Sequence, residues 1–261
     1  MRAVIQTDYG SADVMKLEEL EKPAPGAGQV LVHVRAASLA AGEYFGMRGK
    51  PFPIRLVIGL LRPKKDYVVG LDCAGTVEAV GPDVSRFQPG DEVFGQCRGS
   101  CAEYACADSA RIALKPSSLT FEQAAAVPTS GCTALQGLRD HGKVQPGQKV
   151  LINGASGGVG TFAVQIAKAL GAEVTGVCRT SNIEMVESIG ADHVIDYTRE
   201  DFTAGERRYD LVLDNVLQHS LCPSSCGRSI ATARSCPTAA SFTSAGSPAR
   251  GSCSSRRGCS H

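Results

Sequence analysis

A glycine-rich loop is the strongest chemical signal in the chain. It consists of Asn153-Gly154-Ala155-Ser156-Gly157-Gly158-Val159-Gly160. The run KVLIN before it predicts a buried strand, and the run VGTFAVQIAKAL predicts a helix. In that setting the glycines permit a tight turn, close approach of the backbone to a pyrophosphate, and close packing of helix on strand. We therefore predict that Gly154 to Gly160 bind a dinucleotide, with its anion at the positive end of the helix dipole. The alternative is a turn with a purely structural role.

The end of the next predicted strand indicates which dinucleotide would bind. It reads Val177-Cys178-Arg179-Thr180-Ser181-Asn182. An NAD-specific site usually has Asp or Glu here, about 20 residues after the loop, to hold the ribose 2′-hydroxyl. An acid would repel a 2′-phosphate, whereas the guanidinium of Arg179 suits one. The sequence therefore favours NADPH, with Arg179 and Asn182 as cofactor-binding residues. The alternative is that Arg179 is a solvated loop residue.

Composition excludes several other classes of protein. The chain has 261 residues, of which 43% are hydrophobic and 20% charged, with a net charge of +1. These values are ordinary for a soluble globular protein and give no reason to expect nucleic acid or an anionic membrane as partner. No apolar window is long enough for a membrane-spanning helix. The start, MRAVIQTDY, lacks the long apolar core of a signal peptide. We expect a cytoplasmic location.

Two patterns of secondary structure follow each other along the chain. Up to about residue 125, short apolar runs such as Val30–Val34, Gly75–Val80 and Glu92–Phe94 alternate with Pro and Gly turns, which predicts an antiparallel β domain. Helices and strands alternate after that point, which predicts a parallel, doubly wound sheet. The expected helices are Phe121–Ala126, Thr133–Leu138, Gly158–Leu170 and Ile183–Ile189. The expected strands are Lys149–Asn153, Glu173–Val177, His193–Ile195 and Tyr209–Asp214.

Three segments together resemble the medium-chain dehydrogenase/reductase superfamily. They are GLDCAGTVEAVGPDVSRFQPGDEVFG, AAAVPTSGCTALQGL and NGASGGVGTFAVQIAKALGAEVTGV. Within the superfamily they are most similar to the zinc-independent quinone oxidoreductase-like branch, and the resemblance extends from Met1 to about Val216. It implies a GroES-like catalytic domain over residues 1–125, a Rossmann-type NADPH-binding domain over residues 126–216, and a cleft between the two.

The residues argue against a metal site. Zinc alcohol dehydrogenases of this superfamily use a Cys in the first-helix region and a Gly-His-Glu motif. This chain has neither Cys nor His in Ser38–Tyr44, and it has Gly70-Leu71-Asp72 in place of the motif. A catalytic zinc needs about three protein ligands, so we expect no metal. Cys97, Cys101 and Cys106 do not have the spacing of a structural zinc lobe, and we interpret them as core or surface thiols.

Without a Lewis acid, the expected reaction is hydride transfer from NADPH to an electron-poor small molecule, a quinone or an α,β-unsaturated carbonyl. The resembling reductases carry an Asn near the nicotinamide where this chain has Ala40. Tyr44 is the candidate catalytic residue, as a donor to the developing enolate; the alternative is a packed surface tyrosine. Thr133 and Asn215 resemble cofactor-binding positions of the family.

Residues 217–261 follow neither pattern and form an aberrant tail. They contain five Arg, twelve Ser and five Cys but no Asp, Glu or Lys, and no periodic apolar face. We expect no secondary structure there. Such a composition is typical of GC-rich coding DNA read in a wrong frame, so we expect a frameshift between Val216 and Cys222. The cofactor sheet would then end at its fourth strand, with an open edge.

Two functional hypotheses follow from the tail. One is an NADPH-dependent quinone or enone reductase by descent, whose truncated form has doubtful activity. The other is a non-catalytic product, either a pseudogene remnant or a cofactor-binding module without turnover. Relatives often dimerise through the edge of the cofactor sheet, so we expect a homodimer only where the full-length fold is restored.

Overall fold

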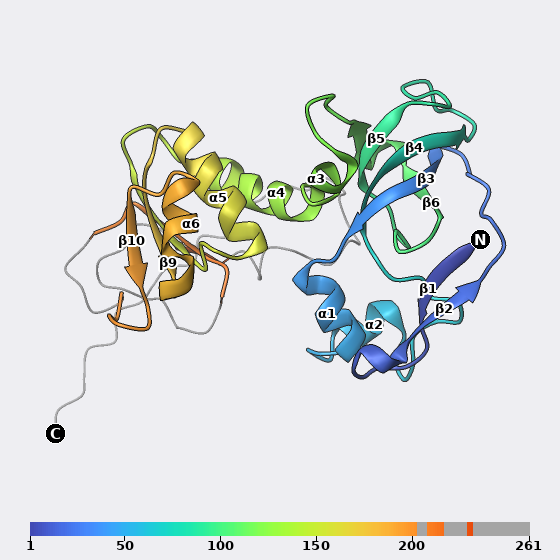
Figure 1. Cartoon of the computed structure of the whole chain (residues 1–261), viewed down its shortest axis with the longest axis horizontal. Coiled ribbons are helices and arrows are strands. Elements are labelled where there is room, and N and C mark those ends of the chain that lie inside the picture. The colour runs from blue at the N-terminus through green and yellow to red at the C-terminus, as the bar shows by residue number, and fades with distance from the viewer. Residues whose placement is uncertain (203–207, 217–228, 232–261) are drawn as a thin grey trace, which may run out of the picture.

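Two five-stranded sheets, one antiparallel and one parallel, dominate the computed structural model, which describes residues 1–202, 208–216 and 229–231. Two helices lie between the sheets, α3 (Phe121–Ala125) and α4 (Pro128–Leu135) (Figure 1). The expected combination of an antiparallel β domain with a parallel α/β sheet is therefore confirmed.

The antiparallel sheet has the strand order β6-β3-β4-β5-β7. Its strands are β3 (Gln29–Ser38), β4 (Asp72–Val80), β5 (Glu92–Gln96), β6 (Tyr104–Asp108) and β7 (Ile112–Leu114). Buried residues alternate with less buried ones along β5 and β6, as expected when one face of a sheet packs on a core. The buried residues of this core are Val30, Val32, Cys73, Val77, Phe87, Val93, Cys97, Ala105, Ala107 and Ile112.

A hairpin and two short helices complete this part of the molecule. The strands β1 (Arg2–Gln6) and β2 (Met15–Glu19) pair antiparallel, with the short η1 turn (Ala12–Val14) between them. The helices are α1 (Ala41–Arg48) and α2 (Ile54–Ile58). The Ala40 N–H donates to the carboxylate of Glu43 at 2.9 Å, which stabilises the first turn of α1.

The helices between the sheets begin at recognisable signals. Thr120 and Gln123 form a reciprocal capping box at the start of α3. Pro128 is the first residue of α4, where its missing N–H is not needed. The sequence predicted a helix over Thr133–Leu138, but α4 begins five residues earlier and continues into the π-helical turn η3 (Gln136–His141). The polar and glycine residues that follow Pro128 hid this start, because they carry no apolar period.

The parallel sheet has the strand order β10-β9-β8-β11-β12, and every neighbouring pair is parallel. Its strands are β8 (Lys149–Asn153), β9 (Glu173–Cys178), β10 (His193–Asp196), β11 (Leu211–Asp214) and β12 (Ser229–Ala231). Two α-helices connect the first three strands, α5 (Gly158–Ala169) and α6 (Ile183–Ser188), and the short η4 turn (Thr180–Asn182) precedes α6. Apart from β12 and the η4 turn, which were not predicted, these bounds match the predicted elements to within two residues.

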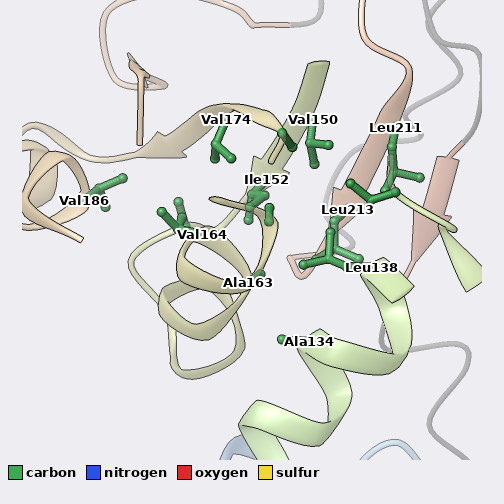
Figure 2. Close-up of a cluster of buried hydrophobic side chains, with 14 of the residues drawn as sticks. Ala134, Leu138, Val150, Ile152, Ala163, Val164, Val174, Val186, Leu211 and Leu213 are labelled. Carbon is green, nitrogen blue, oxygen red and sulfur yellow. The ribbon is translucent and has the colours of Figure 1, made fainter. Parts of the chain in front are cut away.

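Helix α5 covers the parallel sheet through one narrow face. Its buried residues are Gly160, Ala163, Val164 and Ala167, which follow the i, i+3, i+4, i+7 spacing of an amphipathic helix. Figure 2 shows side chains of α4 and α5 gathered against those of β8, β9 and β11. The small residues of α5 let its backbone approach the sheet closely.

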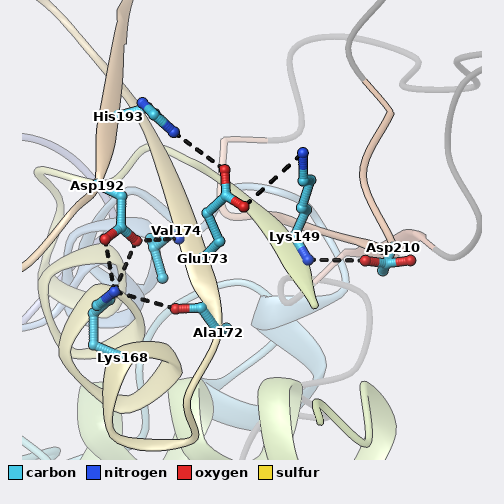
Figure 3. Close-up of polar contacts among 8 residues, drawn as sticks. All are labelled: Lys149, Lys168, Ala172, Glu173, Val174, Asp192, His193 and Asp210. Carbon is cyan, nitrogen blue, oxygen red and sulfur yellow. Dashed lines mark hydrogen bonds and ion pairs between the residues drawn. The ribbon is translucent and has the colours of Figure 1, made fainter. Parts of the chain in front are cut away.

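Polar contacts hold the sheet at the amino end of β9 (Figure 3). The carboxylate of Asp192 accepts from the Lys168 ammonium at 2.7 Å and from the Val174 N–H at 2.7 Å. The Lys149 N–H donates to Asp210 at 2.8 Å. These contacts tie the last turn of α5 to β9 and the start of β8 to the segment before β11.

One expectation about the tail was wrong. Residues 229–231 form β12, which pairs in parallel with Val212–Asp214 of β11. The edge of β11 is therefore covered by a short fifth strand where we expected an open edge and no secondary structure. Pairing along a neighbouring strand depends on backbone groups, which the unusual composition of the tail does not remove. The proposed frameshift point and residues 232–261 lie outside the described residues.

The interpretation of Cys97 as a thiol was also wrong. Cys97 forms a disulfide with Cys73, and their Cα atoms lie 6.3 Å apart. The pairing of β4 with β5 sets this distance, because Cys73 stands opposite Gly95, two residues from Cys97. Cys101 and Cys106 are half-buried free thiols.

Within the part of the chain that the structure describes, no helix combines the length and the apolar character needed to cross a bilayer.

Gly160 permits the closest helix–strand approach, and its replacement tests that packing. A methyl group at this position would overlap the Gly154 carbonyl oxygen. We expect Gly160→Ala to lower the free energy of unfolding by about 1–3 kcal/mol, the usual cost of overpacking. Urea denaturation of the 261-residue chain measures it. The control is Gly42→Ala, where no atom lies within 4 Å of the new methyl group and a helix gains about 0.5–1 kcal/mol. Equal stabilities of the two variants would contradict this packing.

Candidate functional site

The glycine-rich loop lies at the point where the order of strands in the parallel sheet reverses. The chain runs from β8 to β9 and β10 on one side, then returns to β11 on the other side of β8. The loop follows β8, so it stands at the carboxyl end of the strand from which the sheet extends both ways. In open α/β sheets, ligands bind in the crevice at such a switch point. The sequence placed the loop after a strand but did not locate it at the crevice.

Backbone hydrogen bonds define the shape of the loop. Gly154 has φ +76°, which a residue with a side chain seldom adopts. The Ala155 N–H donates to the Val177 carbonyl at 3.0 Å, and the Gly157 N–H donates to the Gly154 carbonyl at 3.0 Å. Ala155 is fully buried, whereas Gly157 and Gly158 are exposed. The loop therefore exposes Gly157 and Gly158 to solvent.

The exposed glycine pair opens helix α5. Gly157 is the residue before its first turn, and no side chain caps it. The first N–H groups of a helix have no partner within the helix, and they lie at the positive end of its dipole. This end of α5 therefore has the donors and the field that a phosphate needs. A Cβ on Gly157 would lie 3.3 Å from the Gly154 carbonyl oxygen, and one on Gly158 would lie 3.3 Å from Ser130 Oγ.

Asn182 connects the loop to the end of β9. Its Nδ2 donates to Ser156 Oγ at 3.0 Å, so the structure brings these two predicted residues together. Arg179 directly follows β9 and is exposed. Among the described residues no ion pair involves Arg179, so its guanidinium is available at the surface beside the loop.

Asp196, an acidic residue at the end of the neighbouring strand β10, accepts hydrogen bonds from residues near Arg179. The carboxylate of Asp196 accepts from the hydroxyls of Thr180 and Thr198 and lies 3.5 Å from the Arg199 guanidinium. The Thr180 hydroxyl is the largest contributor to the lowered pKa of Asp196, followed by that of Thr198. Asp196 therefore stays ionised and holds Thr180, the neighbour of Arg179.

The ends of β8 and β11 are joined on the other side of the loop. The Asn153 amide donates to the buried Asp214 carboxylate at 2.9 Å, and the Asn215 amide donates to the Asn153 carbonyl at 3.1 Å. Asn215 is thereby fixed next to the first residue of the loop. The sequence did not indicate Asp214, which aligns these groups.

Thr133 lies on α4, and this helix borders the loop. The Thr133 hydroxyl donates to the Thr129 carbonyl at 2.7 Å. Ser130 Oγ is 3.3 Å from the point where a Cβ on Gly158 would lie, and α4 packs along α5. The structure thus places Thr133 on a helix that touches the loop.

Tyr44 lies elsewhere, on α1 beside the antiparallel sheet. Its side chain is 49% exposed, and its ring makes an edge contact with Phe45, with centroids 5.7 Å apart. The Arg48 guanidinium lies 5.0 Å from the ring centroid. Among the contacts recorded for the described residues, none joins Tyr44 to the loop, and its surroundings are those of a surface tyrosine.

Asp72, Gln96 and Thr129 form a polar cluster that the sequence did not indicate. Asp72 is 3% exposed and accepts from both the N–H and the hydroxyl of Thr129. Burial raises the pKa of Asp72, and the two hydrogen bonds oppose that rise. Residues 57 positions apart in the chain meet here, so no local pattern could reveal the contact. The only signal was the hydroxyl-rich run after Pro128.

Within the described ranges, no three residues of the types His, Cys, Asp and Glu are grouped so that they could hold a metal ion.

Two family profiles match the chain. The alcohol dehydrogenase GroES-like domain matches residues 26–137, and the zinc-binding dehydrogenase family matches residues 158–226. The first covers all five strands of the antiparallel sheet, and the second begins at Gly158, in the glycine pair of the loop.

Individual proteins extend this similarity. The 2-methylene-furan-3-one reductase of Solanum lycopersicum is 36% identical over 84% of this chain and 58% of its own length. The chloroplastic NADPH-dependent alkenal/one oxidoreductase of Arabidopsis thaliana is 34% identical over 83% of this chain and 57% of its own length. The solved quinone oxidoreductase of Coxiella burnetii is 35% identical, with a TM-score of 0.76 over 83% of this chain and 68% of that structure.

The chain thus spans a little over half the length of these two curated relatives. The two profiles and the solved quinone oxidoreductase nevertheless agree on the fold. The chain belongs to the medium-chain dehydrogenase/reductase superfamily, in its zinc-independent, quinone oxidoreductase-like branch.

Proposed function

We propose that this protein binds NADPH and transfers a hydride to a quinone or an α,β-unsaturated carbonyl compound. The observation that carries the proposal is the uncapped start of α5 at the switch point of the parallel sheet, flanked by Arg179 after β9. The names of the relatives, which include an alkenal/one oxidoreductase and a quinone oxidoreductase, support the same class of reaction.

The choice of NADPH rests on charge. A 2′-phosphate carries negative charge, and a planar guanidinium binds phosphate oxygens in pairs. Arg179 occupies the position where an NAD-specific site has a carboxylate. The nearby carboxylate of Asp196 lies 3.5 Å from the Arg199 guanidinium, which offsets part of its negative charge. The Arabidopsis relative is also named as NADPH-dependent.

The chain's own residues would orient the cofactor and stabilise charge. Bound NADPH supplies the hydride itself. The first turn of α5 would hold the pyrophosphate, Asn182 and Arg179 the adenosine side, and Thr133 and Asn215 the nicotinamide side. We propose Tyr44 as proton donor to the reduced acceptor, because its half-exposed phenol is accessible to a small molecule and the Arg48 guanidinium lies over its ring. An electron-poor acceptor needs no metal ion to accept hydride.

The proposed catalytic and cofactor-binding roles are divided between the two sheets. We propose that residues 1–125 form the catalytic domain and residues 126–216 the cofactor domain. The packing of the helices supports this boundary. It falls between α3, which packs on β3 and β4, and α4, which packs on α5.

The alternative that the sequence left open is a protein that binds the cofactor without turning over a substrate. The names of the relatives, a 2-methylene-furan-3-one reductase and an alkenal/one oxidoreductase, support the reductase and not this alternative. The two functions share the loop and differ only in turnover.

Arg179→Gln tests the choice of cofactor. Loss of a charge-assisted hydrogen bond should weaken NADPH binding by about tenfold and leave NADH binding unchanged. Thermal melting with each cofactor measures this, because a ligand at a hundredfold excess over its Kd stabilises the fold by about 2.7 kcal/mol. Arg35→Gln, an exposed arginine on β3, is the matched control. If both arginine variants bound NADPH like the parent chain, Arg179 would have no part in recognising the phosphate.

Turnover separates the two functions. We expect the 261-residue chain to consume NADPH, followed by its absorbance, when menadione or methyl vinyl ketone is added. We also expect no oxidation of cyclohexanol with NADP+, because an unactivated alcohol needs a Lewis acid. NADPH binding with neither acceptor reduced would establish the binding module and contradict the reductase.

A further inference from the structure

The buried carboxylate of Asp72 makes two hydrogen bonds to one residue of helix α4. Asp72 is the first residue of β4 and is 3% exposed. One oxygen accepts from the Thr129 N–H at 2.9 Å and the other from the Thr129 hydroxyl at 2.7 Å. Thr129 lies in the first turn of α4, where backbone N–H groups have no partner within the helix. A carboxylate at this end of a helix also interacts favourably with the helix dipole.

A neighbouring strand contributes to the same contact. Asp72 and Gln96 are partners across β4 and β5, and the Gln96 amide donates to the Thr129 hydroxyl at 3.2 Å. The next residues along these strands, Cys73 and Cys97, form the disulfide. The hydrogen-bonding ends of β4 and β5 are therefore covalently linked, and both hold Thr129.

Helix α4 carries this contact to the glycine loop. Ser130 follows Thr129, and its hydroxyl oxygen is 3.3 Å from where a Cβ on Gly158 would lie. The Thr133 hydroxyl, one turn later, donates to the Thr129 carbonyl at 2.7 Å. A shift of Thr129 would thus move Ser130 against the loop and Thr133 along with it.

We infer that Asp72 is a positioning residue: by holding Thr129 it sets the place of α4, and thereby of Thr133, relative to the glycine loop. The inference rests on the proposed function, because the quantity that it controls is the placement of the nicotinamide. Hydride transfer requires reacting atoms within about 3–3.5 Å, so a misplacement of about 1 Å lowers the rate strongly.

Asp72 acts through geometry and not as a proton donor. Both of its carboxylate oxygens accept hydrogen bonds from Thr129, and the side chain is closed off from solvent. A role in positioning predicts that an uncharged side chain of the same shape retains function, because Asn can accept from the Thr129 N–H and donate to its hydroxyl. A short apolar side chain cannot.

The experiment compares Asp72→Ala, Asp72→Asn and the parent 261-residue chain. We expect Asp72→Ala to lower kcat by about tenfold or more, to keep the Kd for NADPH within about threefold, and to raise the isotope effect with deuterated NADPH. Asp72→Asn should retain kcat within about threefold. Asp108→Asn is the matched control, because Asp108 caps the short η2 turn (Ser109–Arg111) through the Ala110 N–H and lies outside the cluster.

Two readouts do not need turnover. In the parent chain the Thr129 amide should exchange slowly with deuterium, and Asp72→Ala should accelerate its exchange while the Ala163 amide of α5 stays protected. The fluorescence of bound NADPH should also shift towards that of free NADPH in Asp72→Ala, since the nicotinamide is held less firmly. Thr129→Val, which keeps the N–H and loses the hydroxyl, should give an intermediate result and serves if Asp72→Ala fails to fold.

The outcomes separate this inference from the proposed function. Absence of NADPH binding by the parent chain would overturn the proposed function, and exchange of the Thr129 amide would still decide whether Asp72 holds α4. Unchanged exchange, kcat and bound NADPH fluorescence in both Asp72→Ala and Thr129→Val would overturn the inference. A parallel loss of NADPH affinity and kcat would also overturn it, because a merely structural role predicts that pattern.

Discussion

The close approach of α5 to β8 is the constraint on which the cofactor site depends. Gly160 lies so near the Gly154 carbonyl that no side chain fits between them, and Gly154 itself has φ +76°. These two glycines bring the helix start directly onto the end of the strand, so the uncapped N–H groups of α5 face the crevice of the sheet. The small residues Ala163 and Ala167 maintain the same approach along the helix. A larger residue at any of these points would move the donors away from the position where a phosphate can reach them.

The second constraint is the position of helix α4, which joins the two sheets. The proposed hydride transfer from NADPH requires that residues 1–125 face the nicotinamide at a fixed distance. Helix α4 touches the loop through Ser130 and the antiparallel sheet through Thr129, within its first turn. The connection is therefore short and polar, and the buried carboxylate of Asp72 resists displacement because any shift leaves a polar group unpaired.

The sequence predicted the helices and strands that are set by neighbouring residues in the chain. The strand Lys149–Asn153 has the predicted bounds, and the helix that begins at Gly158 ends one residue before the predicted end, because the apolar runs on either side of the glycines have clear periods. It also predicted the loop itself. It missed contacts between distant parts of the chain: the disulfide of Cys73 with Cys97, the hydrogen bonds of Asp72 to Thr129, and the pairing of residues 229–231 with β11. Each of these depends on which strands become neighbours, which no window of sequence contains. For the proposed cofactor-binding residues outside the loop, the sequence indicated the residue types, whereas their partners, such as Ser156 for Asn182, emerged only from the fold.

Electrostatics explains how an anionic cofactor could bind beside buried acids. Asp196 and Asp214 end the strands β10 and β11, at the same edge of the parallel sheet as the glycine loop. Two free carboxylates there would repel a pyrophosphate. Asp196 instead accepts hydrogen bonds from Thr180 and Thr198, and Asp214 accepts from the Asn153 amide and from the Val216 N–H. These hydrogen bonds fix the residues around the crevice, and the Arg199 guanidinium, 3.5 Å from Asp196, offsets part of the negative charge there. The groups left to meet an anion are donors, the first N–H groups of α5 and the exposed guanidinium of Arg179, so the acids shape the site while the helix and the arginine determine the sign of what it binds.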